Sequence, residues 1–411
     1  MRETSWQLDR TRAAILFERF GPYHHARLNA AGQFFDVWGI EACASETVYA
    51  WKKVEGAEKF RRVTLTELNT NDQRWKKELI RSMWQSLDKI KPHIVVLPGW
   101  SSCDALSALA WCVKNHIPAV VMSESTAWDD QRVFWKEWIK SRLVKCCQAG
   151  LAGGTPHADY LVQLGLPRER IFLGYDIVDN DFFKHQSQKA RAEETSLRKK
   201  QNLPSKFFLA SARFVEKKNL FGLIRAYARY CALAKTACRS EIWDLVLLGD
   251  GALKPALCQL ISELGMTSRI HLPGFKQYDE LPVYFGLAEA FFHASTVEQW
   301  GLVVNEAMAS GLPVLVSNRC GCATDLVHEG VNGFKFDPYN VEDIALRLLQ
   351  VSALTPLQRS AMGEASQCII AGWGPERFSQ GLRDAATLAL KNSHRRFRFF
   401  DRLILQLLLL R

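Results

Sequence analysis

Two carboxylates, Glu298 and Glu306, stand eight residues apart on either side of a glycine, Gly301. A carboxylate accepts two hydrogen bonds at once, which suits it to hold neighbouring hydroxyl groups such as those of a ribose. Two surface glutamates beside an amphipathic helix would show the same spacing, so the neighbouring residues matter. An apolar run precedes Glu298, and another follows at 314–316. This order predicts a strand, a glycine-containing loop, a helix that bears the second carboxylate, and a further strand.

A second group of chemical interest lies earlier in the chain, where Arg213 and Lys218 follow the apolar run 207–212. Cations between a strand end and the next helix suit a diphosphate, because the helix N-terminus adds positive charge of its own. Arginine can bind phosphate through two N–H groups, whereas lysine acts as a point charge. A solvated basic turn would look the same in isolation. The two cations therefore indicate a diphosphate site only in combination with the two glutamates downstream.

Short apolar runs alternate with helix-like stretches along the whole chain, which is typical of βα units around parallel sheets. We predict an α/β protein with two Rossmann-like, doubly wound halves that face a central cleft, since ligands bind where such strands end. The polar, charged stretch 183–204 is predicted to be the linker between them. The predicted segments are a first domain (1–182), the linker (183–204), a second domain (205–374), a helix crossing back to the first domain (375–392) and a basic, apolar tail (393–411).

The segment from Glu298 through Glu306 to Ser317 resembles the E-x7-E signature of retaining GT-B glycosyltransferases, group 1, and of glycosyltransferase family 4 in particular. The resemblance is strong over about 205–390 and recognisable from about 90. It implies an enzyme that moves a hexose-type sugar from a nucleoside diphosphate, with UDP as the expected carrier, to a glycan or lipid-linked acceptor. It also implies that anomeric configuration is retained. Further matching motifs are Leu248-Gly249-Asp250-Gly251, Pro273-Gly274-Phe275 and Trp373-Gly374-Pro375-Glu376.

The resemblance assigns a role to each site residue. Such a transfer must neutralise the diphosphate, fix the ribose and sugar hydroxyls, and shield an oxocarbenium-like transition state from water. The implied catalytic residues are Arg213 and Lys218 on the diphosphate and Glu298 on the sugar side. The implied donor-binding residues are Glu306 on the ribose, the N–H groups of Gly301 and Leu302, and Gly249, Gly251, Phe275 and Gly21 around the nucleotide.

No cofactor and no metal is expected, because basic residues would neutralise the phosphates. Asp179-Asn180-Asp181 spells a D-x-D triplet, the metal motif of a different glycosyltransferase fold, but its surroundings resemble the crossing between domains in GT-B proteins. A non-catalytic protein that binds a nucleotide sugar is the alternative function. The intact set of Arg213, Lys218, Glu298 and Glu306 argues against it.

The first half departs from the family pattern. The loop after the first predicted strand, Gly21-Pro22-Tyr23-His24-His25, has one glycine where the family carries two. Ser123-Glu124-Ser125 follows another strand end and could face the cleft, but no histidine matches the one that many relatives carry in this region. The sequence therefore does not identify the residues that would bind the acceptor. The basic, Trp-containing helix 132–145 is consistent with an anionic acceptor or with a solvated surface.

Charge and cysteine content bear on partners and location. The 411 residues carry a net charge of +10, which favours anionic partners. No nucleic-acid motif is present, so nucleic acid is not expected. The eleven scattered cysteines, with no CxxC spacing, and the polar beginning 1–12 predict a cytoplasmic protein with reduced thiols. The tail 393–411 is too short to span a bilayer. It could lie on an anionic membrane as a peripheral contact, or dock in a groove of the first domain or on a partner chain.

Overall fold

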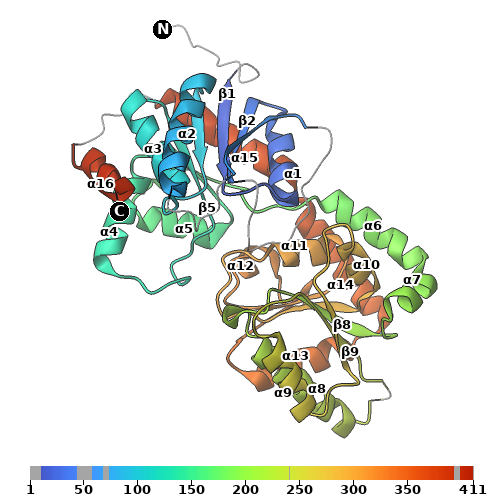
Figure 1. The fold of residues 1–411 in the computed structure, drawn as a ribbon. Coiled ribbons are helices and arrows are strands. Elements are labelled where there is room, and N and C mark those ends of the chain that lie inside the picture. The colour runs from blue at the N-terminus through green and yellow to red at the C-terminus, as the bar shows by residue number, and fades with distance from the viewer. Residues whose placement is uncertain (1–10, 44–57, 68–73, 240, 393–398, 411) are drawn as a thin grey trace. The chain divides into compact units, whose positions relative to one another are not determined.

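A computed structural model describes residues 11–43, 58–67, 74–239, 241–392 and 399–410. The chain forms two compact units, one made of residues 1–177 with 374–411 and the other of residues 178–373 (Figure 1). Each unit is built on its own parallel β-sheet.

The sheet of the first unit has seven parallel strands in the order β3-β2-β1-β4-β5-β6-β7, the doubly wound arrangement in which strand order reverses beside β1. Its elements are β1 (Arg12–Phe17), α1 (Pro22–Ala31), β2 (Asp36–Cys43), β3 (Arg61–Thr66), α2 (Trp75–Ile90), β4 (Ile94–Leu97), α3 (Cys103–Asn115), β5 (Ala119–Ser123), α4 (Phe134–Val144), β6 (Ala149–Ala152), α5 (Thr155–Gln163), β7 (Ile171–Leu173), α15 (Pro375–Lys391) and α16 (Phe399–Leu410).

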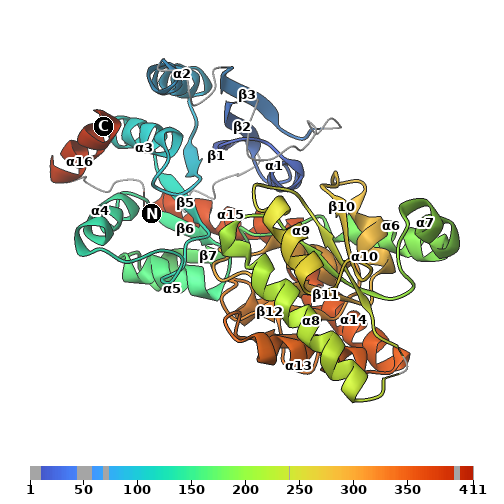
Figure 2. The same ribbon diagram turned by 60° about the horizontal axis from the view of Figure 1, so that its bottom comes forward.

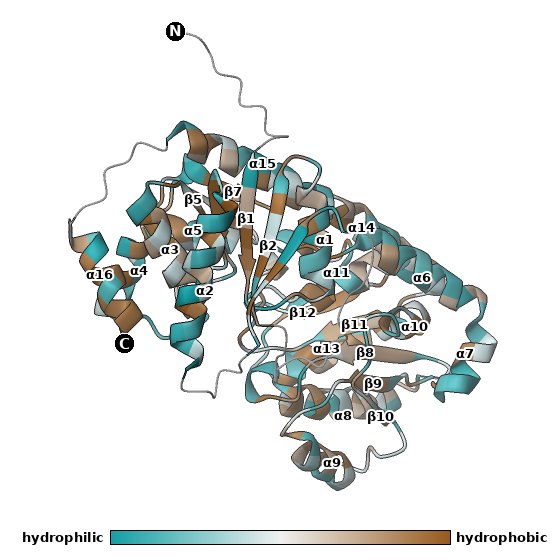
Figure 3. Ribbon diagram, turned by 45° about the horizontal axis from the view of Figure 1, so that its top comes forward, coloured by the Kyte–Doolittle hydropathy of each residue, from teal (hydrophilic) through white to brown (hydrophobic). Residues whose placement is uncertain are grey.

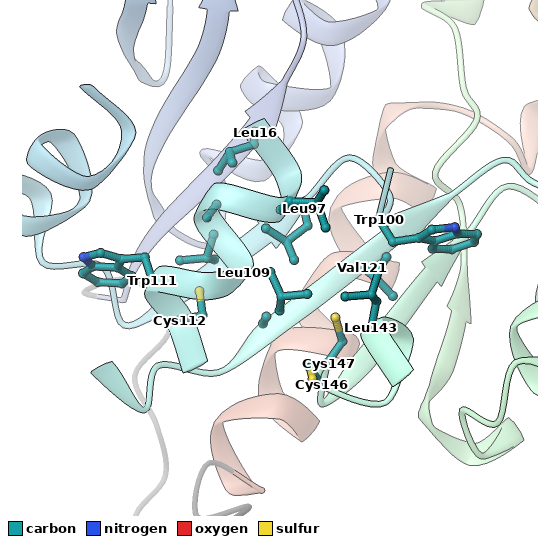
Figure 4. Close-up of a cluster of buried hydrophobic side chains, with 14 of the residues drawn as sticks. Leu16, Leu97, Trp100, Leu109, Trp111, Cys112, Val121, Leu143, Cys146 and Cys147 are labelled. Atoms are coloured by element: carbon teal, nitrogen blue, oxygen red, sulfur yellow. The ribbon is translucent and has the colours of Figure 1, made fainter. Parts of the chain in front are cut away.

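Alternating side chains of these strands pack into two separate cores, because successive residues of a strand point to opposite faces of the sheet. Ile15 belongs to the core beneath α1 and α15, whereas its neighbour Leu16 belongs to the core beneath α2 and α3. Figure 4 shows the second core, where Leu109 of α3, Val121 of β5 and Leu143 of α4 converge. Strands covered on both faces read in sequence as unbroken apolar runs, which is why their positions were predictable.

The second unit has a six-stranded parallel sheet in the order β10-β9-β8-β11-β12-β13, again with a reversal beside its first strand, β8. Its elements are α6 (Asn180–Ala192), α7 (Glu194–Gln201), β8 (Phe207–Ser211), α8 (Leu220–Thr236), β9 (Asp244–Leu248), α9 (Lys254–Glu263), β10 (Ile270–Gly274), α10 (Leu281–Leu287), β11 (Ala290–His293), α11 (Leu302–Ala309), β12 (Val314–Ser317), α12 (Ala323–Leu326), β13 (Gly333–Phe336), α13 (Val341–Ser352) and α14 (Pro356–Ala371).

Helices cover both faces of this second sheet. Figures 1 and 2 show α8, α9 and α13 on one face and α10, α11 and α14 on the other. Local capping fixes where several of these helices begin. Asn340 accepts a hydrogen bond from the backbone N–H of Asp343 at the start of α13, and Thr355 with Gln358 forms a capping box at the start of α14.

The predicted linker at 183–204 is wrong, because this stretch forms helices α6 and α7 within the second unit. Phe183, Ser187 and Ala190 line one buried face of α6, and the hydroxyl of Ser187 bonds to that of Ser310 at 2.9 Å. The other faces are polar and exposed, and Figure 3 draws α6 mostly in the hydrophilic colour. Two of these three contact residues are small, so the buried face gave no apolar pattern to recognise. The second unit consequently begins at Val178 and ends at Trp373.

The C-terminal helices belong to the first unit. α15 packs against α1 and against the strands β5, β6 and β7. α16, within the tail predicted at 393–411, packs against α3 and α4, so the tail docks on the first unit instead of extending from it. Among the described residues, no helix has both the length and the apolar character required to cross a membrane.

Candidate nucleotide-sugar site

The predicted site residues of the second unit gather at one edge of its sheet. All six strands are parallel, so the loops after their carboxyl ends emerge at the same edge. Arg213 and Lys218 follow β8, Gly249 follows β9, Phe275 follows β10 and Glu298 follows β11. β8 and β11 are neighbours at the point where the strand order reverses, which is where doubly wound sheets bind ligands.

Lys218 and Glu298 form an ion pair across this switch point, although they are 80 residues apart in sequence. Each side chain is only 12% exposed. The hydroxyl of Ser295 also donates to the same carboxylate oxygen of Glu298, at 3.0 Å. Burial by itself would raise the pKa of Glu298, but Lys218 and His293 outweigh that effect and hold the pKa well below its ordinary value. The carboxylate is therefore ionised and fixed in orientation.

His293 is a site residue that was not predicted from the sequence. Its Nε2 lies 3.0 Å from Oε2 of Glu298 and 3.1 Å from the hydroxyl of Ser295. An ionised carboxylate can only accept, so Nε2 carries the proton in this contact. Burial lowers the pKa of His293, and although Glu298 opposes that effect, the imidazole is held neutral. The residue ends the apolar run Ala290–His293, and only its position five residues before Glu298 could have signalled a role.

The loop that carries Glu298 is tied to the loops on both sides. The backbone N–H of Thr296 donates to the carbonyl of Lys217 at 2.9 Å, which joins it to the loop after β8. The backbone N–H of Gly321 donates to the carbonyl of Glu298 at 3.1 Å, which joins it to the loop after β12. These backbone hydrogen bonds fix the position of the Glu298 loop relative to the Lys218 loop, and they do not depend on side chains.

α11 presents the second glutamate. Gly301 precedes the helix with a φ of +102°, a left-handed conformation that favours glycine, and Leu302 is the first helical residue. Glu306 lies in the second turn and is fully buried. Glu306 also acts on Tyr278. The pKa of Tyr278 is raised mainly by burial and, as the next largest effect, by the negative charge of Glu306. The neighbouring Asn305 accepts a hydrogen bond from the Trp300 indole at 2.9 Å, which anchors the start of the helix.

Gly249 and Gly251 hold the loop of Arg213 by close backbone approach. A Cβ on Gly249 would lie 1.8 Å from the carbonyl oxygen of Ala212, and one on Gly251 would lie 2.7 Å from that of Phe214. Both glycines also have positive φ. Arg213 stands between Ala212 and Phe214, so these glycines position the arginine. A direct contact of the glycines with a nucleotide remains a prediction.

The other predicted residues are more scattered. Phe275 follows Gly274 on the loop after β10 and is partly exposed, so its ring can meet a planar base. Gly21 lies in the first unit as the N-cap of α1, and its backbone N–H donates to Nδ1 of His24 at 3.1 Å. Asp179, of the D-x-D triplet, caps α6 by accepting from the N–H of Phe182 at 2.9 Å. Within the described ranges, no three His, Cys, Asp or Glu side chains gather as a metal site.

The turn at Gly21 carries a prediction about acid stability. Burial, followed by the charge of Arg27, lowers the pKa of His24 to about 3 from an ordinary value of 6.5. As the pH falls from 6.5 towards 3, the unfolded chain binds a proton at this histidine and the folded chain does not, so stability is lost over that window. We expect the Tm difference between pH 7.5 and pH 5 to be smaller in His24→Gln than in the wild type. His185→Gln, at an exposed histidine of α6, should behave like the wild type; equal behaviour of all three proteins would contradict the assignment.

Comparisons with known proteins agree with this fold. Two proteins of known structure superpose on nearly the whole chain. The Anabaena protein HepE in complex with UDP and glucose has a TM-score of 0.71 at 17% identity, over 92% of this chain and 99% of that one. Sucrose-phosphate synthase from Thermosynechococcus elongatus has a TM-score of 0.72 at 15% identity, over 92% and 98%. At such identities the likeness shows the fold alone. Together with the two parallel sheets, it identifies the fold as GT-B.

Sequence relatives match the second half of the chain. Residues 193–368 match the family described as "Glycosyl transferases group 1". Alpha-monoglucosyldiacylglycerol synthase of Acholeplasma laidlawii is 27% identical over 202 residues, which are 48% of this chain and 48% of that protein. The lipopolysaccharide core biosynthesis glycosyltransferase LpsE of Rhizobium meliloti is 29% identical over 171 residues, which are 42% and 46%. The matched region thus spans about half the length of these relatives.

The position of His293 leads to a prediction about rate. In His293→Leu, Glu298 loses a hydrogen-bond donor, so we expect kcat to fall about tenfold, as for a bond to a charged group, with a smaller change in KM. Because His293 helps to lower the pKa of Glu298, its loss should move the acid limb of the pH–rate profile to higher pH. His293→Gln keeps an N–H donor and should restore part of the rate.

His271→Leu is the matched control for this experiment. His271 also contacts a carboxylate, Asp244 at 2.9 Å, but Asp244 begins β9 at the opposite end of the strand from the site. We expect its pH–rate profile to match the wild type. An unshifted acid limb in His293→Leu would show that His293 does not position Glu298.

Proposed function

We propose that this protein is a glycosyltransferase that takes a hexose-type sugar from a nucleoside diphosphate, retains its anomeric configuration, and needs no metal. The observation that carries the proposal is the buried contact of Glu298 with Lys218 and His293 at the switch point of the sheet. A surface salt bridge would not require a buried histidine to fix it. The same loop lies inside the region that matches the group 1 family.

The proposed roles follow from charge and position. Arg213 binds the diphosphate and stabilises the charge that develops on it as the sugar leaves. The ammonium of Lys218 has three N–H donors, so it can serve Glu298 and a phosphate oxygen together. The backbone N–H groups of Gly301 and Leu302 lie at the start of α11, where a helix N-terminus suits a further phosphate oxygen.

The sugars are assigned to the two glutamates. Glu306 accepts from the ribose hydroxyls, and Glu298 accepts from the transferred hexose or orients its pyrophosphate. Phe275 stacks on the base. Gly249 and Gly251 act through the loop of Arg213, and Gly21 of the first unit is also proposed to bind the donor. UDP is the proposed carrier, since HepE was crystallised with UDP and glucose, and the two cationic side chains take the place that a metal holds in other transferases.

A glycan or lipid-linked acceptor is proposed from the chemistry of the relatives. The Acholeplasma relative is named as the synthase of a glucosyl diacylglycerol, and a Campylobacter jejuni relative, 36% identical over 125 residues, is named as acting on a diphospho-undecaprenol. The net charge of +10 suits an anionic acceptor such as a lipid diphosphate. The corresponding proposed location is the cytoplasm, with the protein bound peripherally at a membrane surface.

The test is release of the nucleotide from a panel of UDP-, GDP- and ADP-sugars, first without an acceptor. We expect slow hydrolysis of one donor, unchanged by EDTA, with the freed sugar in the anomeric form of the donor by NMR. The rate should vanish in Arg213→Ala and Glu306→Ala. Release of the inverted anomer would overturn retention. Donor binding by calorimetry, with neither hydrolysis nor transfer to any acceptor, would instead establish a non-catalytic nucleotide-sugar-binding protein.

A further inference from the structure

α16 uses only one of its apolar faces to dock on the first unit. Leu405 is fully buried there, and Ile404 and Leu408 pack on the core beneath α3. Arg142 of α4 pairs with Asp401 at 2.6 Å and secures the first turn of the helix. Figures 1 and 2 show α16 beside α3 and α4 in both views. A helix that needed only to dock would carry polar residues on its remaining faces.

The outer face of α16 is apolar instead. Phe400, Leu403, Leu407 and Leu410 recur at intervals of three and four residues, so they form one stripe along the helix. They are exposed by 64%, 39%, 57% and 84%. Four large apolar side chains in one exposed row are more than the single residues that scatter over ordinary protein surfaces.

α4, which packs against α16, carries three exposed aromatic side chains. Phe134 is 87% exposed, and Trp135 and Trp138 are about half exposed. The Arg142 guanidinium lies 6.0 Å from the ring of Trp138 and pairs with Asp401, so the aromatic row of α4 reaches the first turn of α16. The two rows form a surface that we name the α4/α16 face.

The charges around the α4/α16 face are positive. The two acidic residues of these helices are paired, Glu137 with Lys140 at 2.8 Å and Asp401 with Arg142. Lys136, Lys145 and Arg402 are exposed to solvent. Apolar side chains interleaved with exposed cations are complementary to a layer that is apolar within and anionic outside. Tryptophan favours such a boundary because its ring is apolar and its N–H is polar.

We propose that the α4/α16 face docks this protein on the surface of an anionic lipid bilayer. The helices would lie in the plane of the interface, with Phe134, Trp135 and Leu407 entering the acyl boundary and Lys136 and Arg402 at the headgroups. The docking rests on exposure and charge alone. Its purpose, to hold the enzyme beside a lipid-linked acceptor, rests on the proposed function.

The experiment is sedimentation of the full-length protein with vesicles of phosphatidylcholine or of phosphatidylcholine with phosphatidylglycerol, without any donor. We expect binding to the anionic vesicles that weakens with salt. Phe134→Ser with Trp135→Ser should weaken it by about tenfold or more, since each ring loses apolar burial. Leu407→Gln with Leu410→Gln should do the same, and Lys136→Glu with Arg402→Glu should remove the preference for anionic lipid. Leu357→Gln is the matched control, at an exposed leucine of α14 in the second unit.

Three results would overturn the proposal. The first is a wild-type protein that does not sediment with the anionic vesicles. The second is equal loss of binding in Leu357→Gln. The third is a wild-type dimer in light scattering that becomes a monomer in Phe134→Ser with Trp135→Ser, because a second copy would then cover the face. Nucleotide release with a water-soluble acceptor should be unchanged in all these variants, so failure of docking and failure of the proposed function remain distinguishable.

Discussion

Arg213→Ala should lower kcat by roughly 100- to 1000-fold, the loss expected when one preorganised donor to a developing negative charge is removed. The size of the effect follows from the contacts around Lys218. Part of the Lys218 charge is neutralised by Glu298, its partner in the buried pair. In the proposed reaction the leaving diphosphate would therefore depend mainly on Arg213, whose loop is held by the close approach of Gly249 to Ala212. The measurement is the steady-state rate of nucleotide release with the donor that the wild type uses.

Two variants separate charge from geometry in this experiment. Arg213→Lys keeps the charge but loses the forked N–H pair, so we expect an intermediate rate. Lys217→Ala removes an exposed cation four residues further on and should keep a nearly normal rate. If Arg213→Ala kept a nearly normal rate, the arginine would have no part in leaving-group stabilisation. If Lys217→Ala lost as much, the effect would be one of general charge.

Glu306→Ala should weaken donor binding by about 100-fold, because two hydrogen bonds from the ribose to its carboxyl oxygens are lost and each contributes about 1.5 kcal/mol. Full burial of Glu306 strengthens the expectation, since water replaces the lost bonds poorly there. The measurement is calorimetry with the nucleoside diphosphate that the wild type releases. Glu306→Gln keeps the shape and one acceptor oxygen, and should bind with intermediate affinity.

A 2′-deoxy nucleoside diphosphate tests whether Glu306 acts on the ribose. The wild type should bind it more weakly than the ribose form, whereas Glu306→Ala should bind the two forms alike. Glu216→Ala, at an exposed glutamate before Lys218, should keep the preference of the wild type. A Glu306→Ala protein that still prefers the ribose form would place the ribose elsewhere.

The parts of the fold that could be predicted are those whose burial leaves a pattern in the sequence. β4 and β12 are covered on both faces, so they read as the apolar runs 94–97 and 314–316. The helix α6 was missed for the opposite reason, since it contacts its neighbours through residues as small as Ser187 and Ala190. The tail was recognised as apolar, but which of its leucines face inward depends on α3 and α4.

The sequence by itself determined the two doubly wound sheets, the group 1 resemblance, and the residue types at the strand ends, because each of these rests on local spacing. The tertiary structure alone decided which of those residues meet. Lys218 reaches Glu298 only because β8 and β11 are neighbours. His293 is the last residue of β11, and its side chain contacts Glu298. Contacts between distant segments depend on strand order, and strand order is set by how the whole sheet packs.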